Sequence, residues 1–320
     1  GDNVYSNYQR SYNNQTWNPV ASVNRLNANS REYGLLLNPY IQLTPIKNLT
    51  VRTQLGINAH IRRSDEFIPK FEIDQLEKST YSHAGREMNE WCDWNWTNTA
   101  NYMTTIAEKH NLNLMAGFTA ERFAHYNVAA GRDATPSNAG NLQEVSAGTL
   151  NQTASGNTTY STLLSYIGRV MYNYNDRYYL TATLRMDGSS KFPAGNKYAT
   201  FPSISAAWRV SNEPFMQNQN VVNNMKVRAG WGRVGNQNIS NSAYLTLIGQ
   251  SDAAFGSTPV RLPGTTISSV GNRSLKWETV EDYNFGIDMS FLDSRLDVTV
   301  DVYQKKSTDM LYAKQNILAD

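Results

Sequence analysis

Cysteine is nearly absent from this sequence, because Cys92 stands alone among 320 residues. A single cysteine excludes an internal disulfide, and with only four scattered histidines a zinc knuckle is not expected either. A membrane-spanning helix needs about 18 consecutive apolar residues, and no apolar run in the sequence comes near that length, so such a helix is excluded. No signal peptide opens the chain at Gly1, which for an exported protein indicates a mature, truncated or internal sequence.

Charge is also scarce, at 18% of the residues against about 25% in a typical soluble domain. The net charge of +2 gives no reason to expect nucleic acid or anionic lipid as an electrostatic partner. Polarity comes instead from 36 asparagines together with Thr, Ser and Gln. These neutral groups suit a water-filled interior or long loops. The apolar content is lower than a conventional hydrophobic core of this size would need.

What the sequence does contain is a strict alternation of apolar and polar residues. Between Leu49 and Arg62 the odd positions are apolar except Thr53, and the even positions are polar except Gly56. Fourteen residues of this pattern exceed the usual strand of about five or six. About ten such segments are predicted to be strands: 32–44, 49–62, 93–106, 111–126, 163–174, 178–187, 201–212, 226–234, 277–291 and 296–306. Pro39 cannot donate to a ladder, so a bulge or edge is expected there.

The connections between these segments alternate in length. Short turns rich in Asn, Asp and Pro occupy 44–48, 107–111, 174–177 and 292–295, whereas long connections occupy 63–92, 127–162 and 235–276. An antiparallel meander places alternate connections at opposite rims, so one rim carries the short turns and the other carries the long connections. The sequence therefore predicts an all-β fold, an antiparallel up-and-down transmembrane β-barrel with lipid on the apolar side and water on the polar side. Aromatic pairs eight residues apart, Trp94 with Tyr102 and Tyr283 with Phe291, are expected at the two membrane interfaces.

Three stretches also carry a resemblance. The segments 165–216, 222–239 and 274–311, which include "RMDGSSKF", "KVRAGWGRVGNQ" and "LKWET", closely resemble the SusC/RagA family of TonB-dependent outer-membrane transporters of the Bacteroidetes. The resemblance implies a barrel of about 22 strands filled by an N-terminal plug and covered by a SusD-like surface lipoprotein. With about ten strands, residues 1–320 are expected to form part of such a barrel domain, with the plug absent from this chain.

Two groups of residues are candidates for solute binding. Asp187, in the "DGSSKF" stretch, and Arg185 share the water-facing parity, where they form either a polar track for solute or a hydrogen-bonded wall that supports the plug. Asp187 and the serines after it could also chelate a cation, although a structural hairpin is the preferred interpretation. The aromatic residues expected in or near loops either stack on sugar rings or peptide, or pack against a partner lid: Tyr81, Trp91, Tyr126 and Tyr244.

No catalytic set stands out, since the histidines lack ligand spacing and neither a Ser/His/Asp set nor a paired-carboxylate motif is evident. The glycines of "GWGRVGNQ" lack the context of a phosphate loop, and neither a cofactor nor a metal is predicted. The resemblance implies TonB-driven import of oligosaccharides or oligopeptides with a SusD-like lipoprotein, TonB acting through a segment not in this chain. A non-transporting surface adhesin is the alternative, and a secreted β-rich hydrolase is a third.

Overall fold

Strands dominate the structure, a computed structural model that describes residues 18–73, 77–216, 218, 221–255 and 260–312. One α-helix, α1, spans Pro19–Arg25. The strands are β1 Asn27–Leu37, β2 Tyr40–Ile46, β3 Leu49–Ile68, β4 Phe71–Glu72, β5 Lys78–Ser79, β6 His83–Ile106, β7 His110–Asp133, β8 Leu150–Tyr174, β9 Tyr178–Ser189, β10 Tyr198–Arg209, β11 Val222–Asn236, β12 Leu247–Phe255, β13 Val260–Ser269, β14 Glu278–Phe291 and β15 Leu296–Thr308. Short 3-10 helices cover Gly140–Leu142, Val145–Ala147, Ala194–Asn196, Val210–Asn212 and Pro214–Met216.

Eleven strands form one sheet in the order β1, β3, β6, β7, β8, β9, β10, β11, β14, β15, with β2 also paired to β3. Each pair whose register is resolved is antiparallel. Apart from β1 and β2, which both pair with β3, and the separate β4–β5 and β12–β13 hairpins, strands that are consecutive in sequence are adjacent in the sheet, and the predicted up-and-down meander is confirmed. Over the residues that the structure describes the sheet stays open, with β1 and β15 as its edges.

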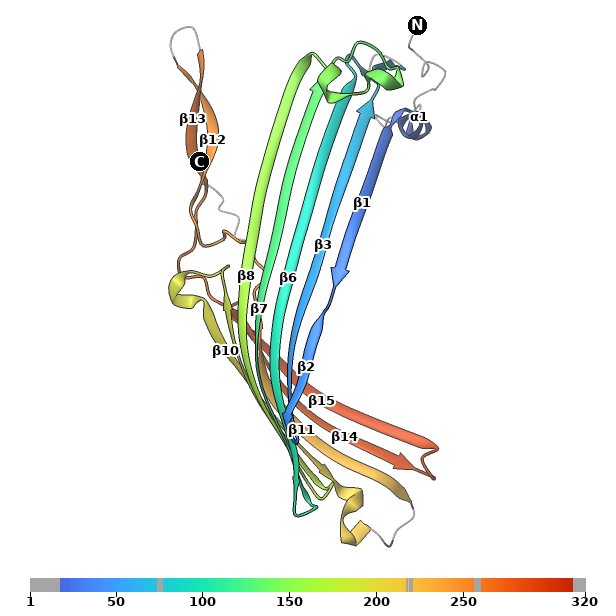
Figure 1. Cartoon of the computed structure of the whole chain (residues 1–320), viewed down its shortest axis with the longest axis vertical. Helices are drawn as coiled ribbons and strands as arrows, with labels where there is room; N and C mark the ends of the chain where they lie inside the picture. The colour runs from blue at the N-terminus through green and yellow to red at the C-terminus, as the bar shows by residue number, and fades with distance from the viewer. Residues whose placement is uncertain (1–17, 74–76, 217, 219–220, 256–259, 313–320) are drawn as a thin grey trace. The chain divides into compact units, whose positions relative to one another are not determined.

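The chain divides into two compact units, which are described separately. Unit 1 comprises Gly1–Leu37, Gly56–Trp94 and Phe123–Tyr160, and unit 2 comprises Asn38–Leu55, Asn95–Arg122 and Ser161–Asp320. In unit 1, parts of β1, β3, β6, β7 and β8 run side by side, and α1 lies at the start of β1 (Figure 1). In unit 2, β9 to β11, β14 and β15 continue the sheet, and β12 and β13 form a separate hairpin.

The register in unit 2 places like residues in rows across the strands. One row of cross-strand partners is apolar: Val170, Ala182, Ile204, Trp231 and Tyr283. The adjacent row, whose side chains point to the opposite side, is mainly polar or small: Met171, Thr181, Ser205, Gly230 and Asn284. We call these the apolar face and the polar face of unit 2. The alternation in the sequence thus becomes two chemically distinct surfaces.

No second protein layer covers the apolar rows within the described residues. Large apolar side chains such as Ile204, Leu184 and Val300 are 48%, 56% and 50% exposed. Exposing so much apolar surface to water costs free energy, so these rows fit a hydrocarbon environment.

None of the helices in the described part of the chain is long and apolar enough to cross a membrane.

Several boundaries differ from the prediction. The expected strand 32–44 is interrupted at Asn38 and Pro39, which separate β1 from β2, as the missing N–H of proline leads one to expect. The long connections are shorter than predicted, because β3, β6, β7 and β8 reach 20 to 25 residues each. The connection 235–276 contains the β12–β13 hairpin, and helix α1 was not predicted.

A small aromatic core closes one end of unit 2. Phe192, Phe201 and Trp277 are buried together, with the ring of Trp277 5.0 Å from Phe192 and 5.5 Å from Phe201. Phe192 belongs to the "DGSSKF" stretch, whose Ser190 Oγ accepts a hydrogen bond from the backbone N–H of Thr162 at 2.9 Å. The motif therefore packs the connection between β9 and β10 against the sheet, in agreement with a structural role.

Candidate functional site

The polar face of unit 2 holds a cavity of about 470 Å³ beside the aromatic core. Its lining includes Arg169, Arg185 and Asp187 from β8 and β9, together with Phe201 and Trp277 of the aromatic core. Cavities of this size that combine apolar side chains with a few fixed polar groups are typical ligand sites. The sequence predicted that Arg185 and Asp187 share the water-facing side, and both line this cavity.

The polar groups of the cavity are held by one another. Arg185 Nε donates to both carboxylate oxygens of Asp187 at 2.8 Å, and its Nη2 donates to Ser165 Oγ at 3.1 Å. Arg169 Nε donates to Thr183 Oγ1 at 3.3 Å. Asp187 is only 7% exposed, and because water cannot solvate its carboxylate fully, the ion pair with Arg185 stabilises the charge. The guanidinium of Arg185 is half-exposed and retains accessible donors.

Farther along the polar face, Arg228 bridges two strands. Its Nε and Nη2 donate to Asp288 at 2.9 and 3.1 Å, and its Nη1 lies 2.8 Å from Asp301 Oδ1. Gly286 lies between these groups, and a Cβ added there would approach Arg228 Cζ and Asp301 Oδ1 to 2.6 Å. The glycine therefore makes room for a three-strand ion network on the water side.

The apolar face ends in a ladder of aromatic rings at the rim that carries the short turns. His110, Tyr174, Tyr178 and Trp208 follow one another at centroid distances of 4.9, 6.3 and 6.5 Å. Glu213, beyond the end of β10, accepts hydrogen bonds from Tyr178 Oη at 2.7 Å and Trp208 Nε1 at 3.0 Å. These two donors hold the pKa of the Glu213 carboxyl below its usual range. Amphipathic rings of this kind are typical of the aromatic girdles at membrane interfaces, although these are not the ring pairs predicted from spacing.

In unit 1, a second ladder runs over the face that carries His60. The indole of Trp91 lies 4.7 Å from the ring of His60 and 4.8 Å from the ring of His125, to which it is nearly parallel. His125 Nε2 is 3.0 Å from Asn89 Oδ1, and Arg62 lies 5.5 Å from the Trp91 centroid. Trp91 is thus engaged with two imidazoles, which limits the predicted stacking on a sugar ring to whatever indole surface they leave open.

The six predicted site residues fall in both units. Arg185 and Asp187 meet in unit 2, where Tyr244 lies half-buried in the connection before β12. Tyr81, Trp91 and Tyr126 lie in unit 1. Tyr81 is 46% and Tyr126 is 41% exposed. Because Tyr126 follows His125 along β7, its side chain points away from the face that bears Trp91. Trp91 and Tyr126 therefore do not form one aromatic platform.

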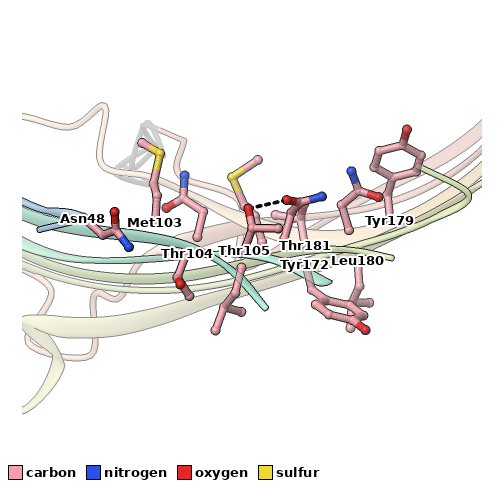
Figure 2. A pocket seen from close by; sticks show the side chains of 13 residues that line it. Asn48, Met103, Thr104, Thr105, Tyr172, Tyr179, Leu180 and Thr181 are labelled. Atoms are coloured by element: carbon pink, nitrogen blue, oxygen red, sulfur yellow. Dashed lines mark hydrogen bonds between the residues drawn. The ribbon is translucent and has the colours of Figure 1, made fainter. Parts of the chain in front are cut away.

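Another hollow in unit 2, of about 620 Å³, lies around the turns before β7 and β9. Figure 2 shows that Met103 and Tyr179 lie on one side of the sheet, whereas Tyr172 and Leu180 lie on the other. A hydrogen bond of 2.7 Å joins Thr105 Oγ1 to Asn111 Oδ1. Since its lining residues belong to both faces, this hollow is not one enclosed binding chamber.

Sequence reasoning missed the Arg228 network and the ring ladders, because both depend on which residues become cross-strand partners. It also missed His83, whose Nδ1 lies 2.7 Å from Asp133 Oδ1. Within the described residues, no group of three or more His, Cys, Asp and Glu side chains is arranged to hold a metal ion. The groups that the two units present are hydrogen-bonding side chains, ion pairs and aromatic rings.

Comparisons with known proteins agree with this architecture. The chain matches the family described as "TonB dependent receptor-like, beta-barrel" over residues 1–318. TonB-dependent receptor P39 of Formosa agariphila is 30% identical over 303 residues, which are 92% of this chain and 28% of the relative. TonB-dependent receptor SusC of Bacteroides thetaiotaomicron is 39% identical over 158 residues, 48% of this chain and 16% of the relative.

Among solved structures, that of the RagAB peptide transporter aligns with a TM-score of 0.83 at 24% identity, covering 92% of this chain and 32% of that chain. At this identity the likeness shows the fold. The chain spans less than a third of the length of these relatives. The match over residues 1–318, the antiparallel sheet and the two chemically distinct faces together show that this outer-membrane chain belongs to the TonB-dependent receptor-like β-barrel family.

Proposed function

We propose that this chain forms part of the wall of a TonB-dependent importer that carries oligosaccharides or oligopeptides across the outer membrane. A SusD-like surface lipoprotein would deliver the solute, and TonB would supply energy through a segment outside residues 1–320. The plug would likewise come from outside these residues. The importer binds, retains and releases its solute without covalent chemistry.

The observation that carries this proposal is the pair of faces in unit 2. Apolar partners such as Ile204 and Trp231 suit lipid, while the adjacent row presents polar groups to water. Arg185 and Arg228 add fixed charges to that polar face. A lipid-facing wall with a hydrogen-bonding lining supports passage of a polar solute better than display of loops alone.

Two comparisons support the choice of solute classes. The solved structure with the similar fold is titled a peptide transporter, and the 39% identity to SusC supports kinship with that receptor. The cavity is lined by the Arg185 guanidinium, which offers charge-assisted donors, and by Trp277, which fits a solute with both polar and apolar surfaces. A peptide and a glycan both meet this description.

The test is growth of a strain that lacks the full-length gene, with defined oligopeptides or oligosaccharides as the nutrient source. We expect loss of growth on one class and its recovery with the intact gene. The adhesin alternative predicts unchanged growth on every solute together with reduced surface attachment. In the complemented strain, Arg185→Gln is expected to raise the solute concentration for half-maximal uptake, whereas the turn variant Arg295→Gln should leave it unchanged at equal membrane abundance.

A further inference from the structure

A polar pocket in unit 1 is not used by the site described above. It has a volume of about 240 Å³ and is lined by residues of β3, β6, β7 and β8, among them Ser64, Glu66, His83 and Glu87. Thr153 and Ser155 contribute hydroxyl groups to the same pocket. The space is large enough for one side-chain-sized group, and its lining is rich in hydrogen-bond acceptors.

The ring of His83 is oriented by a carboxylate. Its Nδ1 lies 2.7 Å from Asp133 Oδ1, and Asn151 Nδ2 donates to the other carboxylate oxygen, Oδ2, at 2.7 Å. In the neutral ring this arrangement makes Nδ1–H the donor to Asp133 and leaves the lone pair of Nε2 available as an acceptor. The hydrogen bond at one ring nitrogen thus fixes the tautomer and sets the role of the other nitrogen.

Two glycines keep the open edge of His83 uncovered. A Cβ added to Gly85 would lie 3.2 Å from His83 Nε2, and one added to Gly131 would lie 3.1 Å from His83 Cε1 and 2.9 Å from Thr153 Oγ1. Any larger residue at either position would therefore crowd the ring or fill the pocket. By contrast, a Cβ on Gly156 would find its nearest neighbour at 3.5 Å, an ordinary contact.

The charge balance of the pocket is negative. Glu66 and Glu87 line it directly, and Asp133 stands behind His83. Arg86 also lines it, but its guanidinium is paired with Asp65 at 2.7 Å and Glu144 at 2.8 Å. One oxygen of Glu87 accepts from Asn127 Nδ2 at 2.7 Å. Acceptors and negative charge together call for a ligand group that is cationic and rich in N–H donors.

We propose that the pocket at His83 is a subsite for a primary ammonium group of the solute, which donates to His83 Nε2 and to the carboxylates of Glu66 and Glu87. The inference rests on the proposed import function and narrows its solute class. The ammonium group could belong to a lysine side chain or N-terminus of a peptide, or to an amino sugar, and both sources present the same chemistry.

The experiment measures calorimetric binding to the full-length protein in detergent at pH 7. One pair of probes is trilysine and its fully N-acetylated form, and the other is the glucosamine trisaccharide and its N-acetylated form. We expect each accepted amine to bind at least about tenfold more tightly than its acetylated partner, since hydrogen bonds to charged groups contribute that much. A preference confined to one pair identifies the source of the ammonium group.

Three variants locate the effect. Gly131→Ala should remove most of the amine preference by filling the pocket, while the matched variant Gly156→Ala should retain it. Glu66→Gln, at an exposed residue, removes a charge without disturbing packing, and we expect it to weaken amine binding at least about threefold. Glu66→Gln thus tests the subsite even if Gly131→Ala fails to fold.

The proposal is overturned if amine and acetylated probes bind equally, if neither amine binds, or if Gly131→Ala and Glu66→Gln both keep the full preference. Uptake of the acetylated probes by cells separates this failure from that of the proposed function. Continued import without amine preference means that only the subsite is wrong. If the gene deletion has no effect on any uptake, the importer itself is refuted.

Discussion

The two faces of the sheet make a sharp prediction at neighbouring residues of β10. Ile204 is 48% exposed on the apolar face, and Ser205 is exposed on the polar face beside the small partners Thr181 and Gly230. Ile204→Arg places a guanidinium in the middle of the apolar rows, where lipid cannot solvate it. An arginine near the bilayer midplane costs about 2 to 4 kcal/mol in barrels of this kind.

Ser205→Arg is the matched control, because it adds the same side chain one residue away. On the water side its cost should be within about 0.5 kcal/mol, the usual range for surface substitutions. The assay is denaturant unfolding of the full-length protein in lipid vesicles, followed by tryptophan fluorescence. A difference of 2 to 4 kcal/mol corresponds to about a 30- to 800-fold change in the folding equilibrium. Equal losses, or a larger loss for Ser205→Arg, would refute the assignment of lipid and water to these faces.

Three further predictions concern stability and can be measured in the same vesicles. Phe192→Ala, which empties a fully buried site in the aromatic core, should cost about 3 to 5 kcal/mol, whereas Phe215→Ala, at a residue 65% exposed, should cost little. Gly235→Ala should cost about 1 to 3 kcal/mol because its Cβ would overlap the Phe201 ring, while Gly195→Ala meets no atom within 4 Å and serves as its control. The pKa of Glu213 is lowered in the folded state. Its contribution to the free energy of unfolding is therefore complete above the unfolded-state pKa of about 4.3 and is lost as the pH falls through the folded-state pKa. Glu213→Gln should flatten this acid limb of the stability curve, and an unchanged limb would contradict the assigned hydrogen bonds.

The sequence predicts strands best where lipid imposes a single-sided apolar row. The neighbours Ile204 and Ser205 illustrate this, since their opposite chemistry fixes which way each side chain points. Beyond the lipid-facing rows the signal disappears. Residues 63–66 carry Arg63 and Asp65 on one side of β3 and Ser64 and Glu66 on the other, so both sides are polar and no period shows. The structure nevertheless continues the strand to Ile68.

The candidate sites were predictable only in part. Arg185 and Asp187 are two residues apart on one strand, so their shared side follows from the alternation alone. The stacking of Trp91 between His60 and His125 requires the register of three strands, which the sequence pattern does not determine. The same is true of His83 and Asp133, which are 50 residues apart in sequence. Helix α1 has only seven residues, too few for a clear helical period.

The length of β3, β6, β7 and β8 has a consequence for how recognition surfaces change. These strands have 20 to 25 residues, about twice the roughly 9 to 11 that cross a bilayer. The surplus is held in a hydrogen-bonded ladder, so its backbone loses little conformational entropy when a solute or a partner docks. An insertion there would shift the register of every residue that follows. New binding preferences should therefore arise by exchanging side chains at fixed positions, and amide exchange along these ladders should be slow.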